Sequence, residues 1–182
     1  YVELKNINKT YGSYQASRNV NFGIEKGKLI GLLGPSGSGK TTLIKLMLGF
    51  YPPTEGKVSI GGQSLQDLSF KQWRKHCGVV MQEGFIFNDT IANNIAPEDD
   101  IVDKKKLIYA VDMANIRSFI ESLPLKYNTR IGNTGQGLSQ GQKQRILIAR
   151  AIYRNPDYLF FDEATNALDT DNEKTIQRNL DQ

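Results

Sequence analysis

The sequence has 182 residues, of which 39% are hydrophobic and 23% charged, with a net charge of +4. This composition excludes a disordered chain, and the length is sufficient for one domain with a sizeable core. The basic residues are scattered except at Lys104–Lys106, so nucleic acid is not expected as a partner. Cys77 is the only cysteine, which excludes a disulfide framework within the chain and fits a reducing compartment. No apolar run approaches the length of a membrane span.

The first part of the chain has the pattern of β-strands. Val2–Ile7 alternates apolar and polar residues, which predicts a half-buried strand. Val20–Ile24 and Leu29–Leu33 are further predicted strands, joined by a hairpin-like turn at Glu25–Gly27. Leu29–Leu33 is nearly all apolar, which indicates a central strand buried on both faces.

Helical spacing follows from Thr41 to Phe50, and Pro52–Pro53 excludes any continuation. The residues on the apolar side of this predicted helix are Leu43, Leu46, Met47 and Phe50. The next predicted elements are a strand at Lys57–Ile60, a short helix at Phe70–His76 and a buried strand at Gly78–Met81.

The middle of the chain changes character and is predicted to be helical from Thr90 to Leu123. Its apolar stripe consists of Leu107, Ala110, Val111 and Ala114. A glycine-rich loop at Gly132–Gly137, a long helix at Gln140–Tyr153 and a buried strand at Asp157–Phe161 follow. This order predicts an α/β core with an inserted helical subdomain.

A phosphate-binding loop is predicted where Gly34-Pro-Ser-Gly-Ser-Gly-Lys40-Thr41 matches the pattern G-x-x-x-x-G-K-[ST]. Glycines let the backbone N–H groups point at phosphate oxygens, and the following helix adds its positive N-terminal end. Lys40 can reach the β- and γ-phosphates, and the Thr41 hydroxyl can bind magnesium. A chance Gly/Ser loop is the alternative, but the match lies between a predicted strand and a predicted helix. The candidate residues for ATP are Gly34, Pro35, Ser36, Gly37, Ser38, Gly39, Lys40, Thr41 and Thr42.

Two carboxylates follow the predicted strand Asp157–Phe161. Asp162 at the end of a buried strand beside the phosphate loop is placed to hold magnesium. Glu163 diverges from it and can polarise an attacking water, which makes Glu163 the catalytic candidate. A solvated Asp-Glu turn is the alternative.

Leu138-Ser-Gln-Gly-Gln142 resembles the LSGGQ signature of ATP-binding cassette proteins, with Gln140 in place of the usual first glycine. Tyr11 stands where that family has its adenine-stacking aromatic residue, Gln82 resembles the Q-loop glutamine, and Ala167–Asp169 resembles the D-loop. These motifs occur in the family's order, and the resemblance extends over nearly the whole chain.

The resemblance implies one nucleotide-binding domain over 1–182. It would have a P-loop NTPase core with a mixed, mostly parallel sheet and an antiparallel β subdomain. The core would comprise 1–82 and 155–182, and the inserted helical subdomain with the signature motif would comprise 83–154. Gln82 is implied as a contact of both the nucleotide and the magnesium ion.

An exporter is implied by three further resemblances. Thr129–Gly135 is similar to the X-loop of exporters, with Asn133 in place of the usual Glu, and Val79–Ile91 is similar to their Q-loop region. The run Gln142–Arg150 resembles peptidase-containing bacteriocin and peptide exporters. The resemblance thus implies a motor domain joined to a transmembrane domain of the same polypeptide, at the cytoplasmic face of a bacterial inner membrane.

The signature also has a local interpretation, because Ser139 and Gln142 have the spacing of a capping box at a helix start. The family resemblance implies in addition that Ser139, Gly141 and Gln142 contact the γ-phosphate of ATP held by a second copy. The implied partner is a second nucleotide-binding domain in a head-to-tail dimer with two ATP molecules between the copies.

Two alternatives to the exporter are a soluble cassette ATPase and a regulatory module with a dead site. A soluble cassette ATPase usually has large insertions or a second cassette, and a regulatory module with a dead site commonly lacks the carboxylate found at Glu163. The polar stretch ending at Gln182 has a helical pattern, and the chain does not begin with Met, so we expect a piece of a longer polypeptide. The family's switch histidine would lie beyond this stretch, so we expect slow or no ATP hydrolysis by the chain alone.

Single residues outside these motifs have simpler expected roles. Tyr14 and Trp73 are expected to be packing residues, with Tyr14 as the alternative to Tyr11 for adenine stacking. Cys77 is expected to be a small buried residue, and His76 is expected at the surface.

Overall fold

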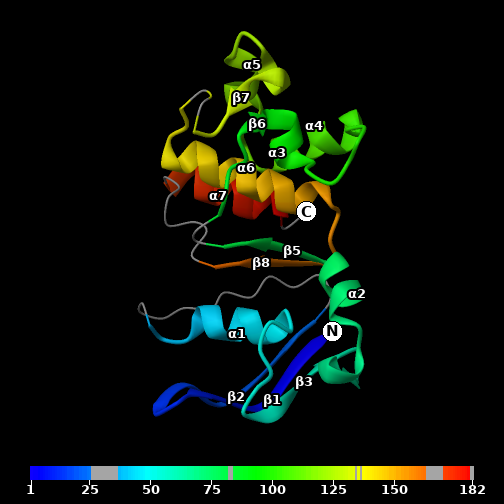
Figure 1. Ribbon diagram of the computed structural model, residues 1–182, viewed down its shortest axis with the longest axis vertical. Coiled ribbons are helices and arrows are strands. Elements are labelled where there is room, and N and C mark those ends of the chain that lie inside the picture. The colour runs from blue at the N-terminus through cyan, green and yellow to red at the C-terminus, as the bar shows by residue number, and fades with distance from the viewer. Residues whose placement is uncertain (26–36, 82–83, 134, 136, 163–169, 181–182) are drawn as a thin grey trace. The chain divides into compact units, whose positions relative to one another are not determined.

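The computed structural model describes residues 1–25, 37–81, 84–133, 135, 137–162 and 170–180. The chain forms two compact units, Tyr1–Cys77 and Gly78–Gln182 (Figure 1). None of the helices in the described ranges has the length and apolar character needed to span a bilayer. The predicted strand Leu29–Leu33 lies outside the described residues, as do Lys26 and Gly27 of the predicted turn.

The first unit contains a four-stranded antiparallel sheet in the order β2-β1-β3-β4. Its strands are β1 (Val2–Tyr11), β2 (Tyr14–Ile24), β3 (Glu55–Ile60) and β4 (Gln63–Ser64). The predicted strands Val2–Ile7, Val20–Ile24 and Lys57–Ile60 are confirmed. The first half of β2 was not predicted, because its residues are largely polar and Asn19, with a φ of 46°, interrupts the alternation.

Helix α1 (Lys40–Met47) is shorter than the predicted Thr41–Phe50. Leu43, Leu46 and Met47 are buried as predicted. Gly49 adopts a φ of 70° after the helix, and Phe50 beyond it is 54% exposed, with the Arg74 guanidinium 5.3 Å from its ring centroid. The prediction that Phe50 packs on the apolar side of α1 is therefore wrong, because the left-handed turn at Gly49 redirects the chain.

The remaining helices of this unit are the 3-10 turn η1 (Leu65–Asp67) and α2 (Phe70–Lys75), which confirms the predicted short helix. Trp73 is buried as predicted, and its Nε1 donates to the Met47 carbonyl at 2.8 Å. Cys77 is buried and His76 is exposed, also as predicted.

The second unit is mainly helical. Its helices are α3 (Ile91–Ile95), α4 (Lys104–Met113), α5 (Arg117–Ser122), η2 (Lys126–Asn128), α6 (Gln140–Tyr153) and α7 (Thr170–Leu180). Its strands pair as β5 (Cys77–Val80) with β8 (Tyr158–Phe161), and as β6 (Asp89–Thr90) with β7 (Arg130–Ile131). Both predicted bounds of the helix Gln140–Tyr153 are confirmed.

The predicted helical stretch from Thr90 to Leu123 is divided into α3, α4 and α5. Pro97 follows the end of α3, where it cannot continue a helix. Asn115, with a φ of 50°, separates α4 from α5. The predicted stripe is confirmed, because Leu107, Ala110, Val111 and Ala114 are all buried in one apolar cluster with residues of α3 and α6.

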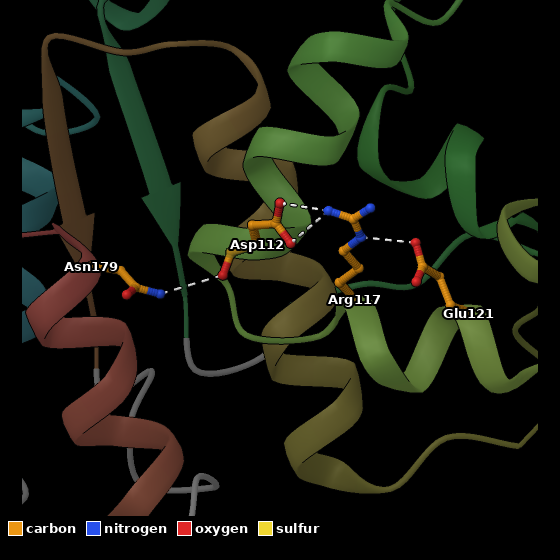
Figure 2. A network of polar contacts seen from close by, with 4 residues as sticks. All are labelled: Asp112, Arg117, Glu121 and Asn179. Atoms are coloured by element: carbon orange, nitrogen blue, oxygen red, sulfur yellow. Dashed lines mark hydrogen bonds and ion pairs between the residues drawn. The ribbon is translucent and has the colours of Figure 1, made fainter.

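Hydrogen bonds from Asn179 connect α7 to the end of α4 (Figure 2). Asn179 Nδ2 donates to the backbone carbonyls of Asp112 at 3.3 Å and Met113 at 3.1 Å. Arg117 donates to the Asp112 carboxylate at 3.0 Å and to the Glu121 carboxylate at 2.8 Å. These exposed ion pairs contribute little free energy individually, and the Arg117–Asp112 pair links α5 to the end of α4.

The apolar cluster predicts a sharp contrast between two isoleucines. Ile146 of α6 is fully buried, whereas Ile101 is 89% exposed. Ile146→Ala should lower the free energy of unfolding by about 2–5 kcal/mol, because it leaves a cavity in a packed core. Ile101→Ala should change it by less than about 0.5 kcal/mol. Urea unfolding of both variants checks this, and equal losses would contradict the assigned core.

Candidate functional site

The start of α1 is formed by two glycines in the left-handed region, Gly37 with a φ of 82° and Gly39 with a φ of 87°. Gly39 is the N-cap of α1, and no side chain caps the helix there. The N-terminal end of a helix carries a partial positive charge and N–H groups that can bind an anion. The turn Gly37–Gly39 therefore presents an anion-binding helix terminus.

Strand β2 lies directly against this turn. A Cβ on Gly39 would lie 2.3 Å from the Ala16 carbonyl oxygen and 3.5 Å from Ser17 Oγ. No side chain fits in that space, so only glycine lets the turn rest on β2. Ser17 Oγ is buried and makes no hydrogen bond with the described residues. At Gly37, by contrast, a Cβ would meet no atom within 4 Å in the part of the chain that the structure describes.

Lys40 adds a full positive charge to the same turn. Its side chain is half-buried, and its Nζ donates to Ser38 Oγ at 3.3 Å. Thr41 and Thr42 follow in the first turn of α1 and are half-buried. The structure thus brings together the predicted residues Gly37, Ser38, Gly39, Lys40, Thr41 and Thr42, whereas Gly34, Pro35 and Ser36 lie outside the described residues.

The tip of the β1–β2 hairpin also contacts this turn. Tyr11 and Tyr14 face each other across the tip, and Tyr14 Oη donates to the Gly37 carbonyl at 3.2 Å. Tyr14 is 57% exposed, so the prediction that it is a packing residue is wrong. A polar hydroxyl that bonds the loop keeps this residue at the surface. Tyr11 is 42% exposed, with its ring edge-to-face against Tyr51 at 6.0 Å between centroids.

Asp162 belongs to the second unit, directly after β8. It is 4% exposed, and its backbone N–H donates to the Val80 carbonyl of β5 at 2.9 Å. The strand pairing therefore fixes the backbone that carries this buried carboxylate. Gln82 and Glu163, the other predicted metal and catalytic residues, lie outside the described residues.

The capping box predicted at the start of α6 is present. Ser139 Oγ accepts from the Gln142 N–H at 3.2 Å, and Gln142 Oε1 accepts from the Ser139 N–H at 2.9 Å. Ser139 is exposed, and Gly141 and Gln142 are half-buried. The local function of this motif is thus confirmed, while the start of α6 still faces solvent at Ser139.

Sequence reasoning missed a polar network around Asn94, which is fully buried. Asn94 Oδ1 accepts from the Phe87 N–H at 2.8 Å, and its Nδ2 donates to the Phe87 carbonyl at 3.0 Å. Because both backbone groups of Phe87 are held, the exposed chain before β6 has a fixed conformation. The sequence could have indicated this network, because an asparagine on the same helical face as Ile91 and Ile95 would be buried and would need hydrogen-bond partners.

Arg150 of α6 holds the same segment from the other side. It donates to the Asn94 carbonyl at 2.6 Å, to Asn94 Oδ1 at 3.1 Å and to the Phe85 carbonyl at 2.8 Å. Its guanidinium also lies 4.8 Å from the Phe87 ring centroid. Burial lowers the pKa of Arg150 from its ordinary value, but a guanidinium keeps its charge at neutral pH. The result is a rigid surface that presents Phe85, 66% exposed, and Phe87, 42% exposed.

Comparison with known proteins gives a consistent result. A family model described as "ABC transporter" matches residues 17–166. The chain is 43% identical over 182 residues to an ATP-dependent lipid A-core flippase of Saccharophagus degradans, covering 100% of this chain and 31% of that protein. It is 45% identical over 184 residues to the flippase of the same name from Pasteurella multocida, covering 100% of this chain and 32% of that protein.

Similarity also extends to eukaryotic proteins and to a solved structure. The chain is 42% identical over 186 residues to multidrug resistance protein 1 of Entamoeba histolytica, covering 99% of this chain and 14% of that protein. A bacterial Atm1-family ABC exporter, solved with ATP bound, superposes with a TM-score of 0.90 at 38% identity, covering 98% of this chain and 32% of that chain. The chain thus spans about a third of the length of the flippases and of that exporter.

The turn before α1 generates a matched test. Gly37→Ala and Gly39→Ala each place a Cβ at a positive φ, which costs about 1–2 kcal/mol. Gly39→Ala alone also forces a Cβ into the Ala16 carbonyl. Urea unfolding should therefore show a larger loss of stability for Gly39→Ala. A loss at Gly37→Ala as large as at Gly39→Ala would contradict the described packing of the turn on β2.

Proposed function

We propose that this chain, which belongs to the ABC transporter family, is the ATP-binding and ATP-hydrolysing motor domain of an exporter. The observation that carries the proposal is the turn Gly37–Gly39, which rests on β2 and presents the N-terminus of α1 beside Lys40. Such an arrangement suits the triphosphate of a nucleotide. The similar exporter with ATP bound supports ATP as that nucleotide.

The adenine base is proposed to stack on Tyr11, at the hairpin tip that Tyr14 ties to Gly37. Tyr11 is 42% exposed, which leaves ring surface for stacking. The loop residues Gly34, Pro35 and Ser36 are proposed to complete the phosphate contacts on the strength of the sequence motif.

The chemistry of the proposed ligands suits magnesium, because the Thr41 hydroxyl of the first unit and the Asp162 carboxylate of the second each offer an oxygen of the kind this ion prefers. We propose that these two residues and Gln82 would hold it. Magnesium, when bound, would neutralise charge on the β- and γ-phosphates. Burial of Asp162 at the end of β8 supports a role for its carboxylate other than solvation.

Glu163 is proposed as the catalytic residue, with the water that attacks the γ-phosphate as its partner. Its position directly after Asp162 and β8 supports this assignment. Lys40 would hold the same phosphate and stabilise the charge that moves onto the leaving oxygen.

The signature residues Ser139, Gly141 and Gln142 are proposed to contact ATP held by a second copy of the domain in a head-to-tail dimer. The start of α6 supports this, because it has the partial charge of a helix N-terminus and an exposed Ser139. In the capping box Ser139 Oγ accepts one hydrogen bond, so its own hydroxyl proton can be donated to a phosphate.

We further propose that 1–82 and 155–182 act as the ATPase core and 83–154 as the helical subdomain. The surface of Phe85 and Phe87 would contact the transmembrane domain of the same polypeptide, at the cytoplasmic face of the membrane. Only the run Gln142–Arg150 supports a peptide or bacteriocin as the transported substrate. The relatives described above are named for lipid A-core and multidrug resistance instead. A soluble cassette ATPase is the alternative, and the similarity to exporters disfavours it.

The role of the loop can be tested through Lys40. Lys40→Ala should weaken ATP binding by about 10- to 100-fold, because it removes a charged hydrogen-bond donor to phosphate. Lys71→Ala removes an exposed lysine from α2 and should leave binding unchanged. Isothermal titration calorimetry with ATP measures both. Equal affinities for the two variants would contradict the assignment of the loop.

The dimer can be tested through Glu163. Glu163→Gln keeps the size of the side chain but removes the carboxylate that would polarise water, so bound ATP should persist and hold two copies together. Light scattering with ATP should report a dimer for Glu163→Gln and a monomer for the double variant Lys40→Ala/Glu163→Gln. A monomer in both cases would contradict the sandwich mechanism.

A further inference from the structure

A compact cluster of two aromatic rings and two lysines surrounds the residue proposed to stack on adenine. Tyr11 packs edge-to-face with Tyr51, with ring centroids 6.0 Å apart and an interplanar angle of 85°. Lys9 Nζ lies over both rings, 5.1 Å from the Tyr11 centroid and 5.8 Å from the Tyr51 centroid. Lys45 of α1 lies over Tyr51 at 5.9 Å.

The ammonium of Lys9 is held in this position by a direct hydrogen bond. Its Nζ donates to the Pro52 carbonyl at 2.9 Å. Lys9 and Tyr11 are two residues apart on β1, so their side chains start from the same face of the strand. Because the Lys9 ammonium is anchored, it limits the movement of the Tyr11 ring on the side of the ring where the ammonium lies.

The loop that carries Tyr51 is itself fixed to β1. The Thr54 N–H donates to the Asn8 carbonyl at 2.9 Å, and the Thr10 N–H donates to Thr54 Oγ1 at 3.1 Å. Asn8 Nδ2 also donates to the Glu55 carboxylate at 2.8 Å. These contacts hold Tyr51 against Tyr11 before any ligand binds.

We infer that Lys9 is a positioning residue that strengthens stacking of the nucleotide base on Tyr11. The inference rests on the proposed function of this site. A cation over one part of an aromatic ring is attracted by its π electrons and draws them toward itself. The ring then stacks more favourably on an electron-rich purine, and it loses less conformational freedom on binding because Lys9 and Tyr51 already hold it.

Titration of the chain with ATP and with inorganic tripolyphosphate distinguishes binding of the base from binding of the phosphates. Lys9→Met keeps most of the aliphatic stem and removes the charge. It should weaken ATP binding about two- to fivefold while leaving the affinity for tripolyphosphate nearly unchanged. Lys9→Arg, which retains a cation able to stack on the ring, should restore ATP binding.

Lys45→Met is the matched control, because it removes the same charge from a lysine that lies over Tyr51. It should affect ATP binding less than Lys9→Met does. Urea unfolding of each variant verifies that the fold is retained.

Three results would overturn the inference while leaving the proposed function intact. These are unchanged ATP binding in Lys9→Met, an equal loss for ATP and tripolyphosphate, and an equal loss of ATP binding in Lys45→Met. If the unsubstituted chain bound neither ligand, the proposed function would fail and the inference with it.

Discussion

The carbonyl oxygen of Ala16 lies 2.3 Å from the position that a Cβ on Gly39 would occupy, and the rest of the proposed site depends on this approach. Because Gly39 has no side chain, the chain before α1 can rest on β2 and then turn directly into the helix. The turn sets where the N-terminus of α1 lies and where Lys40 begins. It also brings Gly37 within reach of Tyr14 at the hairpin tip. The residues proposed to bind phosphate and base are thereby held close together within the first unit.

In the second unit, hydrogen bonds of buried polar side chains fix the conformation of the exposed segment at Phe85 and Phe87. In the first unit, a close approach between backbone atoms has that role for the turn before α1. Asn94 hydrogen-bonds both backbone groups of Phe87, and Arg150 donates to the Phe85 carbonyl and to the carbonyl and side-chain oxygens of Asn94. Leaving such groups unpaired would cost free energy, so the network allows few alternative conformations. The rigid exposed aromatic surface is the consequence.

Much of the fold could be predicted from the sequence, wherever a periodic hydrophobic pattern was bounded by residues that mark the start or end of a helix or strand. The helix Gln140–Tyr153 was predicted in full, because Ser139 and Gln142 mark its start and the apolar spacing is regular. The division between α4 and α5 was not, because Asn115 in a left-handed conformation leaves no mark on hydrophobic periodicity. The end of α1 was misplaced for a similar reason, since the turn at Gly49 precedes the prolines that the prediction relied on.

The sequence motifs predicted which residues belong to the candidate site, but they did not predict the contacts that hold these residues in place. Local spacing identified Gly37–Thr41 and Asp162, but the contacts of Tyr14 with Gly37 and of Lys9 with Tyr51 depend on how segments distant in the sequence come together. Sequence order says nothing about which polar residues those pairings bring together. Tyr14 was predicted to pack because it is aromatic, but its hydroxyl has a hydrogen-bond partner at the surface.

Hydrogen–deuterium exchange at the backbone of Gly37–Thr42, with and without ATP, tests whether this turn binds the triphosphate. If the turn on β2 presents N–H groups to the triphosphate, these amides should exchange more slowly when ATP is bound. The amides of α5, such as Phe119, should be unaffected as an internal reference. Unchanged exchange at Gly37–Thr42 in a chain that binds ATP would contradict the account, because the nucleotide would then be held elsewhere.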